Sequence, residues 1–220
     1  MSILFVLLTF LLSITITHLL DSKREASREP AFVPASPVPK IALAQGFEIP
    51  SSYAFHLGHT WVFDEGRQST RVGLDRLAAT LFGKIDRIQV TGLGRWVRQG
   101  QKLMTLTTGN LSVDVVSPVE GMVLAANPKV LKDPNLVTQD PYGEGWILAV
   151  QSPDLQTNMR NLVRGPFVLP WMKQSLDALR SLVSSAVPVM AQDGGMPVAG
   201  LLSQAKPDLQ RRLIKEFLLS

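Results

Sequence analysis

The chain contains no cysteine among its 220 residues. This absence excludes disulfides, thiolate zinc sites, iron–sulfur ligation by the chain and a cysteine nucleophile. Histidine is scarce too, because only His18, His56 and His59 occur, and a site with several histidine ligands is poorly supplied. We therefore expect no metal site.

Strong charge and catalytic motifs are missing as well. The net charge is only +4, and the basic residues are scattered rather than interleaved with aromatic ones, which argues against nucleic-acid binding. No Ser-His-Asp arrangement, phosphate-cradling loop or paired-carboxylate motif occurs. We expect no enzymatic activity, no cofactor and no small-molecule substrate.

A long apolar run opens the chain. Residues 3–20 carry no charge, and a bilayer core of roughly 30 Å needs about 20 mainly apolar residues. A cleaved signal peptide is the alternative, but it would begin with basic residues, and no Lys or Arg precedes this run. We predict a transmembrane anchor over residues 1–20 that contacts the lipid bilayer through residues 3–20.

The orientation of this anchor follows from its flanks. Lys23, Arg24 and Arg28 come directly after the span, and positive flanks tend to stay cytoplasmic. The predicted protein is single-pass, with the bulk of the chain in the cytoplasm; an inverted anchor that displays a periplasmic domain is the alternative. Residues 21–50 are predicted to be a linker, because five prolines break any helix there.

Short β-prone runs separated by glycine occupy residues 51–163. The runs lie at residues 61–63, 70–73, 85–90, 103–107 and 112–116, with one short helical segment at residues 74–81. The glycine-marked segments at residues 94–100 and 117–126 play similar roles on the two sides of a hairpin at residues 103–116. Two like halves joined by one hairpin are typical of a flattened lipoyl or biotinyl domain. The predicted fold is thus mainly β, a flattened barrel or sandwich with short helices, preceded by one transmembrane helix and followed by amphipathic helices.

An ordered set of motifs makes this resemblance specific. The motifs are HTWV at 59–62, VGL at 72–74, FGKI at 82–85, VRQG at 97–100, SPVEG at 117–121, Asn127 and DPYGEGWI at 140–147. In this order and spacing they resemble the H protein of the glycine cleavage system, over about half the chain. That family carries lipoate on a lysine of the central hairpin.

The resemblance places an asparagine where the lipoyl lysine should be. The attachment lysine is expected seven residues before the serine of Ser-Pro-Val, and this count from Ser117 reaches Asn110. No lysine occurs between Lys102 and Lys129, and Lys84 and Lys102 lie on the wrong parts of the pattern. An amide side chain on a short stem cannot carry the arm, so we expect no lipoylation and interpret Gly109 and Asn110 as a plain turn.

Two other residues invite a functional reading. His59 is interpreted as a structural part of the first strand rather than as a chemical group. Glu144 stands in a Gly-Glu-Gly turn, where its carboxylate is expected to cap backbone amides.

Residues 164–220 form a predicted helical extension. One apolar stripe runs through Met172, Leu176, Leu179, Val183, Ala186 and Met190, and a second helix is expected from Pro207. That second helix places Phe217 on its apolar side and Arg211 and Arg212 on its basic side. Three interpretations stay open: packing on the central domain, docking to a partner subunit, and lying on anionic lipid.

These features together predict a membrane-anchored, non-lipoylated subunit that acts as a binding or scaffold component of a membrane-associated protein complex. Its partners are expected to be other protein subunits. The candidate interaction residues are Gly109, Asn110, Glu144, Arg211, Arg212 and Phe217. The alternative is a lipoyl carrier, or an accessory of lipoyl-dependent transfer as in glycine cleavage.

Overall fold

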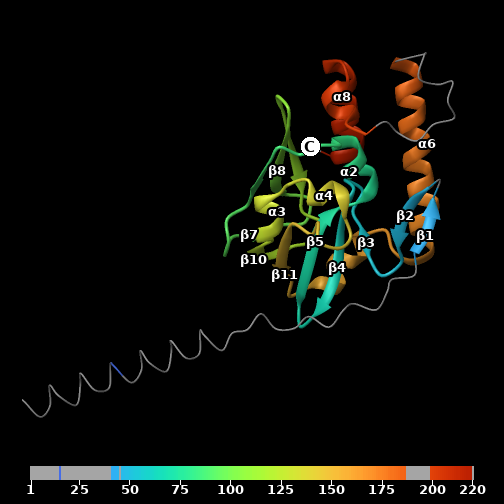
Figure 1. Ribbon diagram of the computed structural model, residues 1–220. Coiled ribbons are helices and arrows are strands. Elements are labelled where there is room, and N and C mark those ends of the chain that lie inside the picture. Colours follow the sequence, from blue (N-terminus) through green and yellow to red (C-terminus); the bar gives the residue numbers. More distant parts are fainter. Residues whose placement is uncertain (1–14, 16–40, 45, 187–198, 220) are drawn as a thin grey trace, which may run out of the picture. The chain divides into compact units, whose positions relative to one another are not determined.

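The computed structural model describes residue 15 and residues 41–44, 46–186 and 199–219 (Figure 1). Met1–Val38 and Pro39–Ser220 form two separate compact units. The predicted anchor, apart from Thr15, and the predicted linker up to residue 40 lie outside the described residues. Within the described part of the chain, no helix has both the length and the apolar character needed to cross a membrane.

Six antiparallel strands form the larger sheet. Their order is β3 (Ala54–Phe55), β4 (Thr60–Gly66), β5 (Ser69–Leu74), β11 (Leu148–Gln151), β10 (Gly121–Ala126) and β7 (Trp96–Val97). The side chains of Val62 and Val72 pair across β4 and β5, and Leu148 pairs with Val72 across β11. All three side chains are buried, so this face of the sheet is part of the core.

The smaller sheet holds the central hairpin. Its three antiparallel strands are β6 (Arg87–Val90), β8 (Lys102–Thr108) and β9 (Leu111–Val116). Met104 and Leu106 are buried while Thr105 and Thr107 are half-buried, which is the period-two pattern of a strand with one covered face. Both sheets contribute to one hydrophobic core. The mainly β prediction is therefore confirmed for the described residues.

Short helices connect the strands. The first, α2 (Arg76–Phe82), begins at Asp75, whose side chain accepts a hydrogen bond from the amide of Ala78, and ends at Gly83 with a φ of 67°. The others are α3 (Pro128–Lys132), α4 (Leu136–Gln139), α5 (Leu155–Asn158), η1 (Met159–Asn161) and η2 (Gly165–Phe167).

Residues 41–50, expected to belong to the linker, form a hairpin instead. Strands β1 (Ile41–Ala44) and β2 (Phe47–Pro50) pair antiparallel, with Gly46 at a φ of 88° in the turn. Phe47 and Ile49 are buried in the core. The alternation of these apolar side chains outweighs the effect of Pro50, because that proline stands at the end of the strand.

After η2, the described residues of the extension form α6 (Val168–Ala186), α7 (Leu201–Gln204), α8 (Pro207–Leu213) and a π-helical turn, η4 (Ile214–Leu218). On α6, Met172, Leu176 and Leu179 are buried as predicted, whereas Leu182 is buried in place of Val183, which is half-buried. Met190 lies outside the described residues. The extension contacts the domain through α6 and β1, α2 and α7, and β9 and η4. Of the three interpretations, packing on the central domain is the one that these contacts support.

Candidate functional site

The β8–β9 hairpin presents its loop to solvent. Thr108 pairs with Leu111, so the loop between the strands consists of Gly109 and Asn110, which are both exposed. Only Gly109 has a positive φ, at 56°. A first loop residue with positive φ is typical of the two-residue turns that match strand twist, so the turn chemistry predicted for this dipeptide holds at Gly109.

Asn110 adds no chemistry of its own to this loop. Its side chain is exposed and forms no hydrogen bond with any described residue. A neutral, solvated amide is neither a nucleophile nor a base at ordinary pH. The arrangement is that of a plain turn.

A carboxylate behind the loop holds it in place. Asp86 accepts a hydrogen bond of 2.7 Å from the amide of Gly109 through Oδ2, and its Oδ1 lies 2.9 Å from the Lys84 ammonium. The hydrogen bond from Lys84 and then that from Gly109 lower the pKa of the Asp86 carboxyl below its ordinary value of 3.8. Lys84 therefore holds its amine beside the hairpin tip, separated from it by one carboxylate, although its position in the sequence placed it away from the hairpin.

The outer face of the hairpin is polar. Asp114 lies 2.7 Å from the Lys102 ammonium and accepts a hydrogen bond of 2.7 Å from the Thr105 hydroxyl. The hydrogen bond from Lys102 is the largest cause of the lowered pKa of Asp114. The Lys102 amine is thus bound by Asp114 on β9, and Lys102 itself stands at the end of β8 that is far from the loop.

The 140–147 motif builds the fold around α2. The carbonyl of Pro141 accepts a hydrogen bond of 3.0 Å from the indole of Trp61, and the hydroxyl of Tyr142 accepts one of 3.1 Å from the amide of Arg76. Burial raises the pKa of the Tyr142 hydroxyl above its ordinary range. A Cβ at Gly145 would lie 3.0 Å from the Val137 Cα, so glycine is needed for this close approach.

The structure corrects the expected role of Glu144. The carboxylate that caps backbone amides in this turn is Asp140, which accepts hydrogen bonds of 3.1 Å from Gly143 and 2.8 Å from Glu144. Glu144 instead points its own carboxylate to Lys129, at 2.6 Å. Asp140 precedes the turn and faces its amides, as capping aspartates do, whereas the Glu144 side chain is exposed. The Glu144 carboxylate is thus exposed on the surface, where it forms an ion pair with Lys129.

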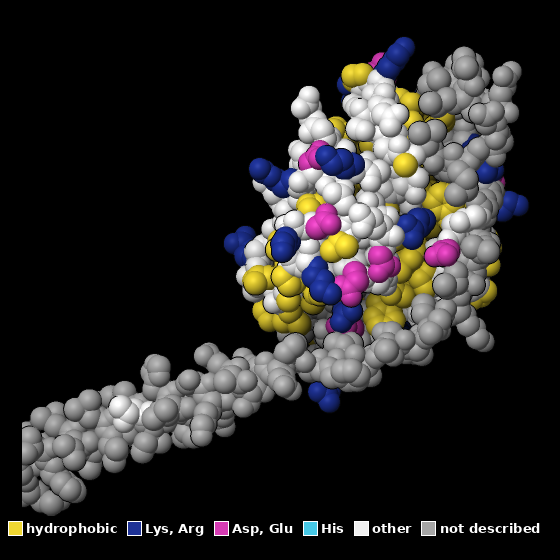
Figure 2. Space-filling view, in the orientation of Figure 1, with side chains coloured by type: hydrophobic (Ala, Val, Ile, Leu, Met, Phe, Trp, Pro, Cys, Tyr) yellow, Lys and Arg dark blue, Asp and Glu magenta, His cyan; other side chains and the backbone are white. Residues whose placement is uncertain are grey.

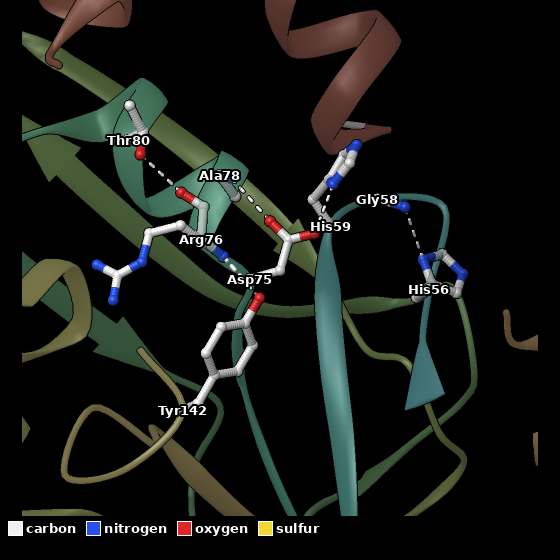
Figure 3. Close-up of polar contacts among 8 residues, drawn as sticks. All are labelled: His56, Gly58, His59, Asp75, Arg76, Ala78, Thr80 and Tyr142. Carbon is white, nitrogen blue, oxygen red and sulfur yellow. Dashed lines mark hydrogen bonds and ion pairs between the residues drawn. The ribbon is translucent and has the colours of Figure 1, made fainter. Parts of the chain in front are cut away.

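A buried histidine lies at the opposite end of α2 from the glycine cap (Figure 3). His59 is 1% exposed, and its Nδ1 is 2.6 Å from Oδ2 of Asp75, whose other oxygen accepts the amide of Ala78. His59 has a φ of 55° and lies against two aromatic rings, those of Trp171 and Phe217. It connects the start of β4 with the start of α2, which supports the structural interpretation.

His56 takes a separate role. Its Nδ1 accepts a hydrogen bond of 3.1 Å from the amide of Gly58, which fixes the turn between β3 and β4. Burial, and then the neighbouring His59, lower the pKa of the His56 imidazole. In the described residues no cluster of histidine and acidic side chains has a geometry that would hold a metal ion.

Comparison with known proteins identifies the family. The sequence model described as "Glycine cleavage H-protein" matches residues 53–167, which is just over half of the chain. The chain belongs to the glycine cleavage H-protein family.

Individual relatives agree with this family. A probable glycine cleavage system H protein 2 from Sulfolobus acidocaldarius is 31% identical over 141 residues, covering 63% of this chain and 89% of the relative. Glycine cleavage system H protein 3 from Aquifex aeolicus is 32% identical over 119 residues, covering 54% and 74%. The crystal structure of a glycine cleavage system H protein from Mycobacterium marinum is similar with a TM-score of 0.44 and 24% identity, over 48% of this chain and 87% of that one.

The H-protein family consists of lipoyl carriers rather than enzymes, which agrees with the expectation that this chain is not itself an enzyme. In this member, no lysine stands on the hairpin between Lys102 and the end of β9. The assignment of Asn110 to the attachment position stays a prediction from the count to Ser117.

Most of the extension lies beyond the family match. It contains the remaining candidate interaction residues, Arg211, Arg212 and Phe217. Phe217 is 3% exposed and packs on His59, so its side chain belongs to the core and is not free for a partner. Arg211 and Arg212 are exposed on α8, and Arg211 forms an ion pair with Asp208 one turn away. The burial of Phe217 follows from the η4–β9 contact, which sequence periodicity does not reveal.

Proposed function

We propose that this H-protein-like chain is a non-lipoylated binding subunit of a membrane-associated protein complex. The observation that carries the proposal is the hairpin itself, which holds no lysine between Lys102 and the end of β9 and whose exposed Gly109–Asn110 loop offers no amine. The domain is otherwise fully built, with its core and its 140–147 motif in place. A domain with an intact core and no amine on its hairpin can still bind a partner protein through its surface.

The membrane part of the proposal rests on residues 3–20 and on the basic residues Lys23, Arg24 and Arg28 that follow them. The protein is then single-pass with the folded domain in the cytoplasm. Deleting residues 1–20 should move the protein from the membrane fraction to the supernatant. A reporter fused to the C-terminus should be active in the cytoplasm; activity only in the periplasm would overturn this orientation.

The binding role is tested by isolating the full chain from its native membranes in mild detergent. We expect one or more other proteins to be recovered in stoichiometric amounts. The same purification after a wash in high salt and strong detergent serves as the control that separates specific partners from adsorbed protein. A clean monomer in mild detergent would contradict the binding role.

A second candidate function is favoured by Lys84. Its ammonium lies 2.9 Å from Asp86, which also binds the Gly109 amide, so one amine stands beside the hairpin tip. A lipoyl carrier would use this amine, after loss of a proton, to attack the carboxyl carbon of a lipoyl adenylate, so that the amide forms and AMP leaves. Intact-mass measurement distinguishes the two functions, since lipoylation adds about 190 Da. The added mass should vanish in Lys84→Arg and persist in Lys102→Arg if Lys84 is the carrier.

A further inference from the structure

Three large apolar side chains are exposed at one edge of the six-stranded sheet. Leu93 is 62% exposed, Trp96 52% and Leu124 42%. Figure 2 shows hydrophobic side chains gathered over β7 and β10, with Lys and Arg side chains beside them. Isolated exposed leucines are ordinary, but a tryptophan and two leucines on one edge mark a surface made for contact.

Backbone pairing makes these side chains neighbours. Trp96 pairs with Met122 across β7 and β10. The amide of Gly94 donates a hydrogen bond of 2.8 Å to the carbonyl of Val123, and the amide of Val123 donates one of 2.9 Å to the carbonyl of Arg95. The segment that carries Leu93 and Trp96 therefore runs alongside the segment that carries Leu124.

Leu124 lies on the outer face of the sheet. Its neighbour Val123 is buried, and successive strand residues face opposite sides, so Leu124 points away from the core. The pairing of β10 with β11 shifts in register between Val123 and Ala125, and Leu124 is the residue left out of it. This leucine therefore has no paired residue on β11, and it stands exposed on the strand that runs beside Trp96.

Two free positive charges flank the tryptophan. Arg95 and Arg98 are exposed, and neither forms an ion pair with a described residue. Tryptophan and arginine are the residue types that contribute most to protein–protein interfaces. We name Leu93, Arg95, Trp96, Arg98 and Leu124 the β7–β10 edge patch.

The occupant of this patch follows from its charges. A second copy of the chain would bring Arg95 and Arg98 of both copies together against only one Glu120 from each, and that carboxylate already accepts a hydrogen bond of 3.2 Å from the Trp96 indole, so the excess of like charge opposes a symmetric pair. An anionic lipid surface would meet the same Glu120 carboxylate at the border of the patch. A protein can satisfy both features with discrete carboxylates placed at the two guanidinium groups.

We propose that the β7–β10 edge patch docks a partner protein that presents apolar side chains flanked by carboxylates. Trp96 and the two leucines supply the apolar contact, and Arg95 and Arg98 bind the carboxylates and set the register. The proposal rests on the binding role proposed above and gives that role its surface. The patch lies away from the hairpin tip and uses no residue of the helical extension.

Photocrosslinking on the full chain in native membranes tests the surface directly. Photoreactive benzoylphenylalanine replaces Trp96 in one variant and Phe167, which is 71% exposed, in the other. Position 96 should crosslink to the protein that copurifies in stoichiometric amounts, at a peptide that contains apolar and acidic residues, and position 167 should not. A crosslink from position 96 to a second copy of this chain, or to the partner from position 167 alone, would overturn the proposal.

Affinity for that copurified protein gives the second test. Trp96→Ala should weaken binding at least about 30-fold, as expected for a central tryptophan. Arg98→Glu should weaken it about tenfold or more at low salt, and less at high salt, because the lost contact is ionic. Phe167→Ala should bind like the unchanged protein. Equal affinity in Trp96→Ala and Phe167→Ala would overturn the proposal.

Two controls separate the causes of failure. Unchanged thermal unfolding of Arg98→Glu, whose side chain is exposed, keeps the test valid even if Trp96→Ala unfolds. Loss in Trp96→Ala of a preference of the full chain for phosphatidylserine over phosphatidylcholine vesicles, with partner binding intact, would assign the patch to lipid and overturn the proposal. Absence of any stoichiometric partner for the unchanged protein would instead contradict the binding role itself.

Discussion

The imidazole of His59 is stacked on the indole of Trp171, with ring centroids 4.8 Å apart and planes inclined by 22°. The histidine lies in the region matched by the H-protein family, and the tryptophan lies on α6 beyond it. Phe217 adds a second ring 5.8 Å from His59. The extension therefore completes the burial of a polar pair that anchors α2, and the two parts share one core.

Removal of the Trp171 side chain should expose His59. In Trp171→Ala we expect diethylpyrocarbonate to modify His59, which is buried and protected in the unchanged protein. The free energy of unfolding should fall by about 2 kcal/mol, since Trp171 is only half-buried. Peptide mass spectrometry locates the modification. Phe167→Ala, at an exposed position nearby in the chain, is the matched control; equal reactivity of His59 in both variants would refute the covering role.

Gly83 should tolerate no side chain, because the extension approaches it closely. Its φ is 67°, and a Cβ there would lie within 2.6 Å of the Gly200 Cα. Gly83→Ala should lower the free energy of unfolding by about 3 kcal/mol or more, from backbone strain and displacement of α7. Gly94→Ala, at a φ of 72° with nothing within 4 Å, carries the strain alone and should cost about 1 to 2 kcal/mol. Denaturation of the full chain in detergent measures both, and equal losses would show that the Gly200 contact is unimportant.

The hydrogen bond from the Gly109 amide to the Asp86 carboxylate should persist down to acidic pH. The pKa of this carboxyl is lowered in the folded protein, so its contribution is complete above the ordinary value of 3.8 and is lost as the pH falls through the lowered value. The Gly109 amide resonance should therefore titrate with a midpoint below 3.8. Lys84→Met removes the largest cause and should raise that midpoint, while the Asp114 titration, which depends on Lys102, stays unchanged. A Gly109 midpoint above 3.8 in the unchanged protein would contradict this hydrogen bond.

Asn110→Lys should create an acceptor for lipoate. The loop is exposed and its two-residue geometry is in place, so an amine at position 110 would project into solvent from the turn. A lipoate ligase supplied with ATP and lipoate should add about 190 Da to this variant. Ser112→Lys is the control on β9, and modification of that variant alone would mean that position 110 is not the attachment position.

The strands and the hairpin were predictable because their signals are local. Alternation at Met104 and Leu106 and the Gly109 turn both act within a few residues. The position of Lys84 near the hairpin tip was not predictable from the sequence, because it depends on the pairing of β6 with β8. The capping role of Asp140 depends on turn geometry, and the cover that Trp171 gives His59 joins residues more than a hundred positions apart. Such contacts follow from tertiary packing and leave no periodic pattern.

The intact mass of the full chain, isolated from its native host grown with ample lipoate, decides whether the domain carries a lipoyl arm. We expect a protein without a lipoyl group, at the 24.1 kDa of its sequence. A mass greater by about 190 Da, lost in Lys84→Arg, would contradict it and make this H-protein relative a carrier with a displaced arm.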